Sequence, residues 1–591
     1  MEKGKQTNKL PKGWIWTTIG EIGIVQSGGT PSTRNQEFWG DEISWITPAD
    51  LSGYNEKYIS KGNRSLSKIG LDYSSAKLLP KGTILFSSRA PIGYTVIAKN
   101  ELATNQGFKN LIPTKSLNSE YVYYYFQTLK SQAEKVASGT TFLELSAIKF
   151  SLLPFPLAPL KEQQRIVSKI ESLFSELDEV EKGLQKAKQQ LEVYRQSLLK
   201  SAFDGKLTEQ WRNENDSEPI ERLQNSINEM RRKQFKDEIT IWEIAFDEWK
   251  KNGGNGKKPF KPKEPYKAPL ISNKESKELA YIPKGWKWVK TSQIISVINN
   301  GYTPKSEFLN EGSGEIPFIK VYNLTFNGEL DFSINPTFIP KEIHQSELKR
   351  SICKPGDVLI NIVGPPLGKV SIVPEIYSEW NINQAIVLFR PNDYISSKYI
   401  SFFMQSSSTI QWLSSTSIGT AGQRNVKVST CRQIPIPLCS VNEQEKIVEI
   451  LESMLSIKEN LEKNIDSSIQ ASKVLRQSIL KKAFDGKLVV QDSSNEPASN
   501  LLKQIKGEKE TYLKRQIDSQ KNAPIKFKKM SKLLSIQEIL KGSTEPMSAK
   551  EVWQKSIHKD NIEEFYAELK QLGDKVKEVK IGLDSLLSLK Q

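Results

Sequence analysis

The sequence predicts an α+β protein built from two copies of one unit, followed by a small helical module at the C-terminus. Each unit consists of a mixed α/β globular domain and a long helix. The entry sequence LPKGWIWTTIGEI at 10–22 returns as IPKGWKWVKTSQI at 282–294. A helical sequence at 154–207 returns at 435–488, displaced by 281 residues without insertion or deletion. The repeat therefore covers a whole domain and its helix, and the constant length predicts a rigid element.

The two helical segments have the pattern of a coiled-coil seam. Apolar residues recur at alternating steps of four and three, which is the 3.5-residue period of packed helices. We predict that the two helices pack on each other; the alternative is two exposed helices, each packing on its own domain. The predicted seam residues are Ile166, Ile170, Leu173, Leu177, Leu184 and Leu191 in the first helix, and Ile447, Leu451, Met454, Leu461, Ile465 and Leu475 in the second.

Polar residues also fall at seam positions of the second helix, namely Lys458, Ser468 and Ser472. Such residues weaken a helix pair but help to fix its register and partner choice. Each helix begins after a Pro-x-Pro sequence and ends near Asp-Gly, which are start and stop signals. At 1.5 Å per residue, each helix is expected to be about 50–70 Å long.

The globular domains combine short strands with helices. Runs such as TILFSS at 83–88 and DVLINIV at 357–363 predict strands, because β-branched residues stand between turn residues. Ser119 and Ser397 are predicted N-caps of helices with buried aromatic faces. Between the two domains the sequence match is loose, and the loops differ in length and chemistry. This pattern is typical of two domains that do the same task on different targets.

The remaining segments are less regular. Residues 211–280 begin with a charged helix and continue as KNGGNGKKPFKPKEPYKAP. This Gly-, Pro- and Lys-rich sequence predicts a flexible solvated linker, and the alternative is that its lysines touch phosphates. We expect the symmetry to end after Leu488. The last part of the C-terminal extension resembles a winged helix-turn-helix, with a plain three-helix docking module as the alternative.

The composition narrows the classes of function that the chain can have. The chain has 84 Lys and Arg against 68 Asp and Glu, a net charge of +16, which favours a polyanionic partner or serves solubility alone. Its three cysteines lack CxxC spacing and it has two histidines, so we expect no zinc or other metal site. The polar N-terminus and the lack of an 18-residue apolar run predict a cytoplasmic protein without a membrane span.

No sequence motif for catalysis is present. The chain has no GxxxxGK[ST] loop, no GxGxxG after a strand, and no recognisable Ser/His/Asp motif around its two histidines. We therefore expect a chain that catalyses nothing itself. Two rival hypotheses stay open. One is a structural tether that binds only proteins, and the other is a nuclease or methyltransferase in its own right.

The duplicated domains, the Pro-x-Pro-Leu…Glu-Gln…Ile-Val openings and the two Ala-Phe-Asp-Gly-Lys-Leu ends resemble the specificity subunit of Type I restriction–modification enzymes over residues 10–490. The resemblance implies two pseudo-twofold-related target recognition domains, each reading one half of a bipartite DNA site, and antiparallel spacer helices between them. It implies double-stranded DNA, two methyltransferase subunits and restriction/translocase subunits as partners. S-adenosylmethionine and ATP are then expected on the partner subunits, and no cofactor on this chain.

With this resemblance the chain divides into six parts. We expect target recognition domains at 1–157 and 281–438, spacer helices at 158–210 and 439–490, the charged helix and linker at 211–280, and the C-terminal extension at 491–591. Because the loops of the two domains differ, we expect an asymmetric site rather than a palindrome. One DNA turn spans about 34–36 Å, so helices of the expected length would hold the half-sites about one to two turns apart.

Candidate DNA contacts follow from hydrogen-bonding chemistry. Arg and Lys bridge guanine, Asn and Gln pair with adenine, and Ser and Thr bind phosphates or bases. For each residue the alternative role is a turn residue or a surface charge. The candidates are Thr30, Ser32, Arg34, Asn35, Ser88, Arg89 and Gln106 in the first domain, and Thr303, Lys305, Lys320, Asn361, Gln384, Gln423 and Arg424 in the second.

Overall fold

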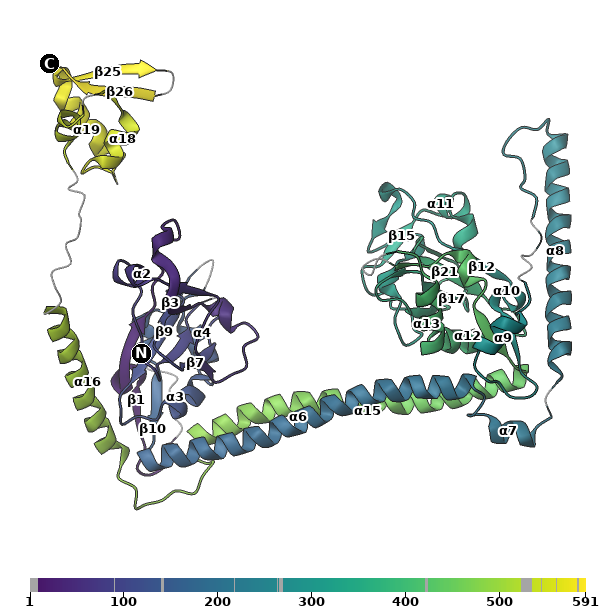
Figure 1. Cartoon of the computed structure of the whole chain (residues 1–591), viewed down its shortest axis with the longest axis horizontal. Coiled ribbons are helices and arrows are strands. Elements are labelled where there is room, and N and C mark those ends of the chain that lie inside the picture. Colours follow the sequence, from purple (N-terminus) through teal and green to yellow (C-terminus); the bar gives the residue numbers. More distant parts are fainter. Residues whose placement is uncertain are drawn as a thin grey trace. The chain divides into compact units, whose positions relative to one another are not determined.

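The computed structural model describes residues 9–590, except 90, 140–142, 217, 263, 265–268, 420–423, 522–533, 544, 560 and 582–583. The chain forms two compact units (Figure 1). The first contains residues up to Lys169 and from Leu480 onward, and the second contains Ile170–Ile479. Each unit holds one copy of the repeated globular domain, and the first unit also contains the C-terminal module.

The first domain is built on a five-stranded sheet with the order β2-β9-β6-β7-β4 and a three-stranded sheet with the order β5-β3-β8. Strands β6 and β9 are buried along almost their whole length, and β9 includes two buried polar residues, Lys109 and Asn110. Its strands are β2 (Gly23–Ser27), β3 (Trp39–Ile46), β4 (Tyr58–Ile59), β5 (Arg64–Leu66), β6 (Ile84–Ser87), β7 (Thr95–Ala98), β8 (Ala103–Thr104) and β9 (Phe108–Pro113). Its helices are α1 (Ile19–Ile22), α2 (Lys68–Asp72), α3 (Ser119–Phe126), α4 (Lys130–Val136) and α5 (Ala147–Ser151).

The second domain repeats this frame. Its sheet order β12-β21-β17-β19 matches β2-β9-β6-β7, and a second sheet has the order β13-β15-β14-β20-β16. The strands are β12 (Val297–Asn300), β13 (Asn310–Glu311), β14 (Ile316–Ile319), β15 (Thr337–Ile339), β16 (Ile352–Cys353), β17 (Val358–Asn361), β19 (Val370–Ile372), β20 (Trp380–Ile382) and β21 (Ile386–Arg390). The helices are α10 (Thr291–Ile294), α11 (Lys341–Gln345), α12 (Ser397–Met404), α13 (Ser407–Thr416) and α14 (Val428–Cys431).

The entry motif and the Pro-x-Pro motif recur together because they pair with each other. Strand β1 (Ile15–Thr18) is antiparallel to β10 (Pro154–Leu157), and β11 (Lys287–Lys290) is antiparallel to β23 (Pro435–Leu438). Each pair closes its domain directly before the long helix begins. The predicted caps of α3 and α12 are wrong by one residue, since the capping side chains are Asn118 and Ser396.

The two long helices, α6 (Leu160–Phe203) and α15 (Val441–Phe484), contain 44 residues each and are therefore about 66 Å long. Polar pairs within the second unit show their direction: as residue numbers rise along α6, the partners on α15 fall. The helices are therefore packed antiparallel, which confirms this part of the predicted fold. The pairs are Asp178–Arg476 at 2.7 Å, Glu181–Ser472 at 2.5 Å, Lys188–Asp466 at 2.6 Å and Glu192–Lys458 at 2.5 Å.

The predicted seam is partly correct. Lys458 and Ser472 lie buried at the interface, whereas Leu461 and Leu475 are 46% and 47% exposed, so their prediction is wrong. An α-helix drifts by about 20° per heptad from a strict 3.5-residue repeat, and here Glu462 and Arg476, the next residues in sequence, turn inward instead. Ser468, also predicted in the seam, is exposed and bonds within its own helix. Of the other predicted seam residues, Ile166, Ile170, Ile447 and Leu451 are buried, and Leu173, Leu177, Leu184, Leu191, Met454 and Ile465 are half-buried.

Each long helix ends on the domain of the other copy. Phe203, at the end of α6, packs against Tyr399 of α12 with 5.3 Å between ring centroids. Phe484, at the end of α15, packs against Tyr121 of α3 at 5.2 Å. Both phenylalanines belong to the repeated Ala-Phe-Asp-Gly-Lys-Leu sequence. This sequence is therefore constant because it joins the two copies.

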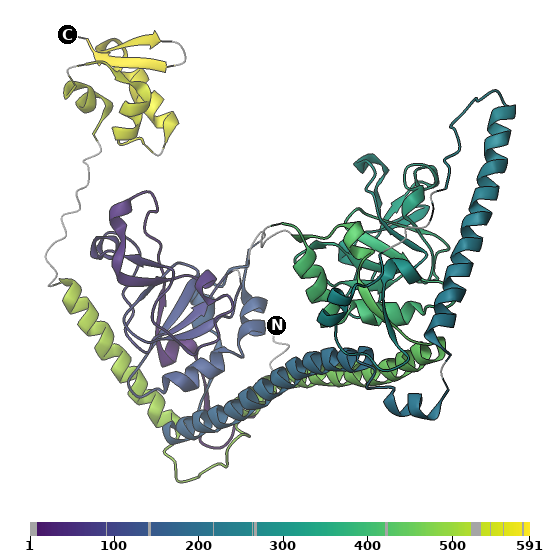
Figure 2. The ribbon, with the colours of Figure 1, turned by 45° about the vertical axis from the view of Figure 1, so that its right-hand side comes forward.

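The repeat continues beyond Leu488, contrary to our expectation. Helices α8 (Ile220–Lys251) and α16 (Ala498–Lys521) both follow a Glu-Pro dipeptide. Helix α8 packs on the second domain, along which it runs in Figures 1 and 2, and α16 packs on the first domain. The buried residues have the same spacing in the two helices: Ile220, Leu223 and Ile227 in α8, and Ala498, Leu501 and Ile505 in α16.

Lys509 and Arg231 strengthen this equivalence. Both stand four residues after the last buried position, and each donates to a main-chain carbonyl in the short helix that follows its domain's entry strand. Lys509 bonds the carbonyl of Gly20, and Arg231 bonds that of Gln293 at 3.0 Å. Two further short helices, α7 (Glu209–Glu214) and α9 (Asn273–Glu278), lie in the segment between the two copies.

The C-terminal module has the helix–strand–helix–helix–strand–strand order of a winged helix-turn-helix, and a plain three-helix module lacks these strands. The sheet order is β24-β26-β25. Among the described helices of the whole chain, none is long and apolar enough to cross a bilayer. The module's elements are α17 (Ile536–Lys541), β24 (Met547–Ser548), α18 (Ala549–Lys555), α19 (Ile562–Leu572), β25 (Val576–Ile581) and β26 (Asp584–Leu589).

Candidate nucleic-acid interface

In the first domain, the loop after β2 is joined to the loop before β9 by a threonine–glutamine pair. The hydroxyl of Thr30 donates to Oε1 of Gln106. Gly28 donates its N–H to the carbonyl of Phe108 at 3.3 Å. A Cβ at Gly28 would lie 1.9 Å from the carbonyl oxygen of Asn105, so this close approach of two loops requires glycine. The two loops therefore form one rigid surface element.

The second domain builds the same element. The hydroxyl of Thr303 donates to Oε1 of Gln384. Gly301 donates its N–H to the carbonyl of Ile386 at 3.0 Å. A Cβ at Gly301 would lie 2.1 Å from the carbonyl oxygen of Ile382. Four of the residues predicted singly as DNA contacts are thus brought together as two equivalent pairs.

The two glutamines are exposed and oriented by their threonines. Because each threonine binds Oε1, the amide Nε2 keeps its two donors and Oε1 keeps a second lone pair. An amide held in this way presents a donor and an acceptor side by side, which is the pattern that pairs bidentately with adenine. Gln106 and Gln384 are therefore the best-supported candidates for base contacts.

Charged side chains surround Gln106 in the first domain. Nζ of Lys109 lies 3.3 Å from the Gln106 carbonyl and 3.6 Å from the Glu144 carboxylate. Arg89 lies 3.7 Å from the same carboxylate. Burial lowers the pKa of Lys109 below its usual value, and Glu144 opposes that shift. Lys109 and Glu144 were missed in the sequence; the signal for Lys109 was a lone lysine inside the apolar strand FKNLIP.

The second domain carries different residues at these positions. Main-chain hydrogen bonds establish the equivalence, because Ser88 donates to Gly107 at 2.7 Å as Ile362 donates to Ala385 at 2.9 Å. Three charged positions of the first domain are uncharged in the second. The equivalent pairs are Arg89 and Val363, Lys109 and Val387, and Glu144 and Asn425.

The other candidates of the first domain differ in their accessibility. Ser32 and Arg34 are exposed on the loop after Thr30. Asn35 accepts a hydrogen bond from the Glu37 N–H at 3.1 Å and so caps the 3-10 turn that follows. Ser88 is fully buried and donates to the Gly107 carbonyl at 3.0 Å. Ser88 thus holds the glutamine loop from behind and is not presented to a ligand.

The candidates of the second domain also differ in their accessibility. Lys305 is exposed, with its Nζ 3.8 Å from Glu307, and the Lys320 Nζ lies 5.9 Å from the Tyr322 ring. Asn361 is buried, and its side chain bonds to three main-chain groups at 2.8–3.1 Å, so it holds a turn together. Arg424 is exposed on β22 (Arg424–Asn425), which pairs with β18 (Val363–Gly364). Gln423 lies outside the described residues.

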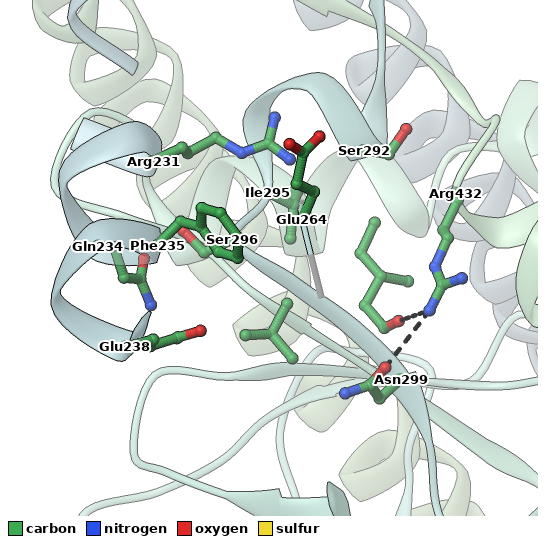
Figure 3. A pocket seen from close by; sticks show the side chains of 12 residues that line it. Arg231, Gln234, Phe235, Glu238, Glu264, Ser292, Ile295, Ser296, Asn299 and Arg432 are labelled. Carbon is green, nitrogen blue, oxygen red and sulfur yellow. Dashed lines mark hydrogen bonds between the residues drawn. The ribbon is translucent and has the colours of Figure 1, made fainter. Parts of the chain in front are cut away.

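A cavity of about 510 Å³ lies between α8 and the second domain and is lined in part by residues 296–299 (Figure 3). Its two arginines, Arg231 and Arg432, donate to main-chain carbonyls at 3.0 and 2.9 Å. They thereby fasten α8 and α14 to the elements beside them. Among the described residues, no three His, Cys, Asp or Glu side chains are placed to hold a metal ion.

Comparisons with known proteins agree with this architecture. A family model described as "Type I restriction modification DNA specificity domain" matches residues 11–189 and 283–471. The MjaIX specificity subunit of Methanocaldococcus jannaschii is 34% identical over 325 residues, which cover 54% of this chain and 60% of that relative. The match thus spans less than two thirds of that relative's length.

Two longer matches extend the comparison. The EcoKI specificity subunit of Escherichia coli (strain K12) is 22% identical over 531 residues, covering 85% of this chain and 96% of that protein. A solved structure described as "Structural basis underlying complex assembly and conformational transition of the type I R-M system" shares 18% identity, with a TM-score of 0.53. It covers 81% of this chain and 100% of its own, and therefore shows the same fold.

Proposed function

The chain belongs to the family of type I restriction–modification DNA specificity proteins, and we propose that it reads a bipartite, asymmetric DNA sequence without catalysing a reaction itself. The observation that carries this proposal is the threonine–glutamine element, which is built twice on one frame. Each domain presents an oriented amide to a base, and the residues around the amide differ between the domains. Equal frames with unequal surroundings are what two readers of different half-sites need.

We further propose that the antiparallel helices serve as scaffold and ruler. A pair of helices with twofold-like symmetry offers two equivalent outer surfaces, which suits two copies of a methyltransferase subunit. Restriction/translocase subunits would join through these subunits. S-adenosylmethionine and ATP would be bound by the partners, and the complex would act in the cytoplasm of a bacterium or archaeon.

Footprinting of the assembled methyltransferase–specificity complex tests this proposal. We expect two protected patches of DNA separated by an unprotected gap, in the presence of competitor DNA. The variants Gln106→Ala and Gln384→Ala should each weaken protection of a different patch. Binding only to the partner subunits, with no footprint, would instead support the tether hypothesis. Cleavage or methylation by the purified single chain would contradict the non-catalytic assignment.

A further inference from the structure

The far end of α8 and the linker behind it form a basic tip. Five exposed lysines gather there within twelve residues, and the sequence from Trp249 to Pro262 contains no acidic residue. The nearest carboxylates in sequence are Asp247 and Glu248, which precede Trp249 on the helix, and Glu264, which follows Pro262. The lysines, hereafter the lysine tip, are Lys250, Lys251, Lys257, Lys258 and Lys261.

An aromatic stack holds the linker against the helix. Trp242, Phe246 and Trp249 lie one above the other on α8, with ring centroids 5.1 and 5.7 Å apart and planes within 20° of parallel. The indole N–H of Trp242 donates to the Pro259 carbonyl, and that of Trp249 to the Gly256 carbonyl, both at 3.2 Å. The segment 256–261, expected to be a solvated linker, is therefore folded back on α8.

The reversal of the chain depends on glycine. Gly253, Gly254 and Gly256 have φ angles of 70°, 74° and 87°, a region in which other residues are strained. The sequence NGGNG thus forms the turn that returns the chain along the aromatic stack. The turn brings lysines that precede it and lysines that follow it close together, since Lys250 and Lys258 lie over the same Phe246 ring.

Three of the lysines lie over the aromatic rings. The Nζ of Lys250 is 4.5 Å from the Phe246 centroid, that of Lys258 is 5.5 Å from the same ring, and that of Lys261 is 5.2 Å from the Trp242 ring. Cation–π contacts position an ammonium group without consuming its three N–H donors. Among the described residues, no carboxylate forms an ion pair with any of the five lysines. The tip therefore presents fixed positive charges that are free to bind an anion.

The base of α8 is fixed to the second domain by its buried residues and by the bond from Arg231 to Gln293 at 3.0 Å. From Arg231 to Lys251 the helix extends for about 30 Å, alongside the domain (Figure 2). Helix α16, its counterpart on the first domain, contains no tryptophan or phenylalanine. Among the described residues, the aromatic stack is therefore found on α8 and has no equivalent on α16.

We propose that the lysine tip binds the phosphate backbone of duplex DNA that flanks the half-site read by the second domain. The contact is independent of base sequence, because flexible ammonium groups bind phosphates as point charges. This inference rests on the proposed DNA-reading function. It predicts a footprint that extends further on one side of the site than on the other.

The test compares the wild-type complex with a variant carrying Lys→Gln at all five positions of the lysine tip. Two specific duplexes are used, one ending at the second half-site and one extending about 20 base pairs, roughly two turns, beyond it. Each phosphate contact contributes about 0.9 to the slope of log affinity against log salt. If three to five of the lysines contact phosphates, the slope of the variant on the long duplex should be smaller by about 3 to 4.5. On the short duplex we expect both proteins to behave alike.

Two further variants make the test specific. Lys→Arg at the same five positions should keep the wild-type slope. Lys→Gln at Lys555, Lys559, Lys570, Lys577 and Lys580 of the C-terminal module removes the same charge elsewhere and should leave the difference between the duplexes unchanged. Equal slopes for wild type and the tip variant on the long duplex would overturn the proposal. Loss of specific binding by the wild-type protein to both duplexes would instead contradict the proposed function.

Discussion

The two globular domains share a frame and differ in the chemistry placed on it. Both fix an exposed glutamine with a threonine hydroxyl, and both bring the two loops together at a glycine. Around Gln106 stand Arg89, Lys109 and Glu144, whereas the equivalent positions in the second domain are uncharged. The comparison teaches that one frame can hold the same oriented glutamine in two different chemical surroundings. On the proposed function, these surroundings would change which bases are read.

The largest expected effect concerns the exchanged helix ends. Phe203→Ala and Phe484→Ala each remove a buried ring from an equivalent site, and such truncations destabilise by about 3–5 kcal/mol. We expect similar losses from both variants, but in opposite domains. Hydrogen exchange should show faster opening of α12 for Phe203→Ala and of α3 for Phe484→Ala. The reverse assignment would contradict the exchange of helix ends between the copies.

A smaller effect is expected from the glutamines. A bidentate base contact discriminates by about 1–3 kcal/mol, so Gln106→Ala and Gln384→Ala should each lower specific affinity by roughly tenfold to a hundredfold. Each variant should relax specificity in one half-site only, as measured by binding to a panel of single-base substitutions. Thr30→Val and Thr303→Val serve as controls, because they keep the glutamine side chain but remove the hydroxyl that orients it. Identical relaxation of both half-sites by either glutamine variant would show that the domains do not read separately.

The third prediction concerns the charged cluster of Arg89, Lys109 and Glu144 in the first domain. Glu144→Gln leaves Arg89 and Lys109 without their shared carboxylate, and a hydrogen bond or ion pair of this exposure contributes about 1 kcal/mol. We expect the base preference to change at the first half-site and to stay the same at the second. The equivalent change in the second domain, Asn425→Ala, should leave the first half-site untouched. Binding selections with randomised half-sites measure both outcomes.

The smallest effect concerns a contact found beside the second domain. Glu275 accepts hydrogen bonds from Ser272 and from Lys290, whose Nζ lies 3.0 Å away, and these bonds lower its pKa from 4.5 to about 2. A carboxylate with a lowered pKa stabilises the fold above pH 4.5, and this stabilisation is lost as the pH falls through about 2. Glu275→Gln should therefore be slightly less stable than wild type near neutral pH in urea unfolding, and the difference should shrink below pH 4.5 and vanish below about pH 2. A difference that persists at low pH would contradict this assignment.

Much of the architecture was predictable, because repeated motifs with a constant spacing are visible in one sequence. The packing of α8 and α16 was missed because their sequences share little beyond Glu-Pro and three apolar positions. Leu461 and Leu475 were misplaced because a periodic pattern cannot show where a straight helix drifts out of phase. Ser88 and Asn361 were chosen for their polarity, but both lie at the ends of buried strands, where main-chain groups need partners. The cluster of Arg89, Lys109 and Glu144 depends on tertiary contacts that no local pattern encodes.

The central claim is that two domains with one frame read two different half-sites. Mapping the adenines methylated by the assembled complex, first wild type and then Gln106→Ala and Gln384→Ala, tests it most directly. We predict two unlike sequence blocks separated by an unspecified gap of constant length, with each variant relaxing a different block. A single continuous block, a palindrome, or the same change from both variants would contradict the account.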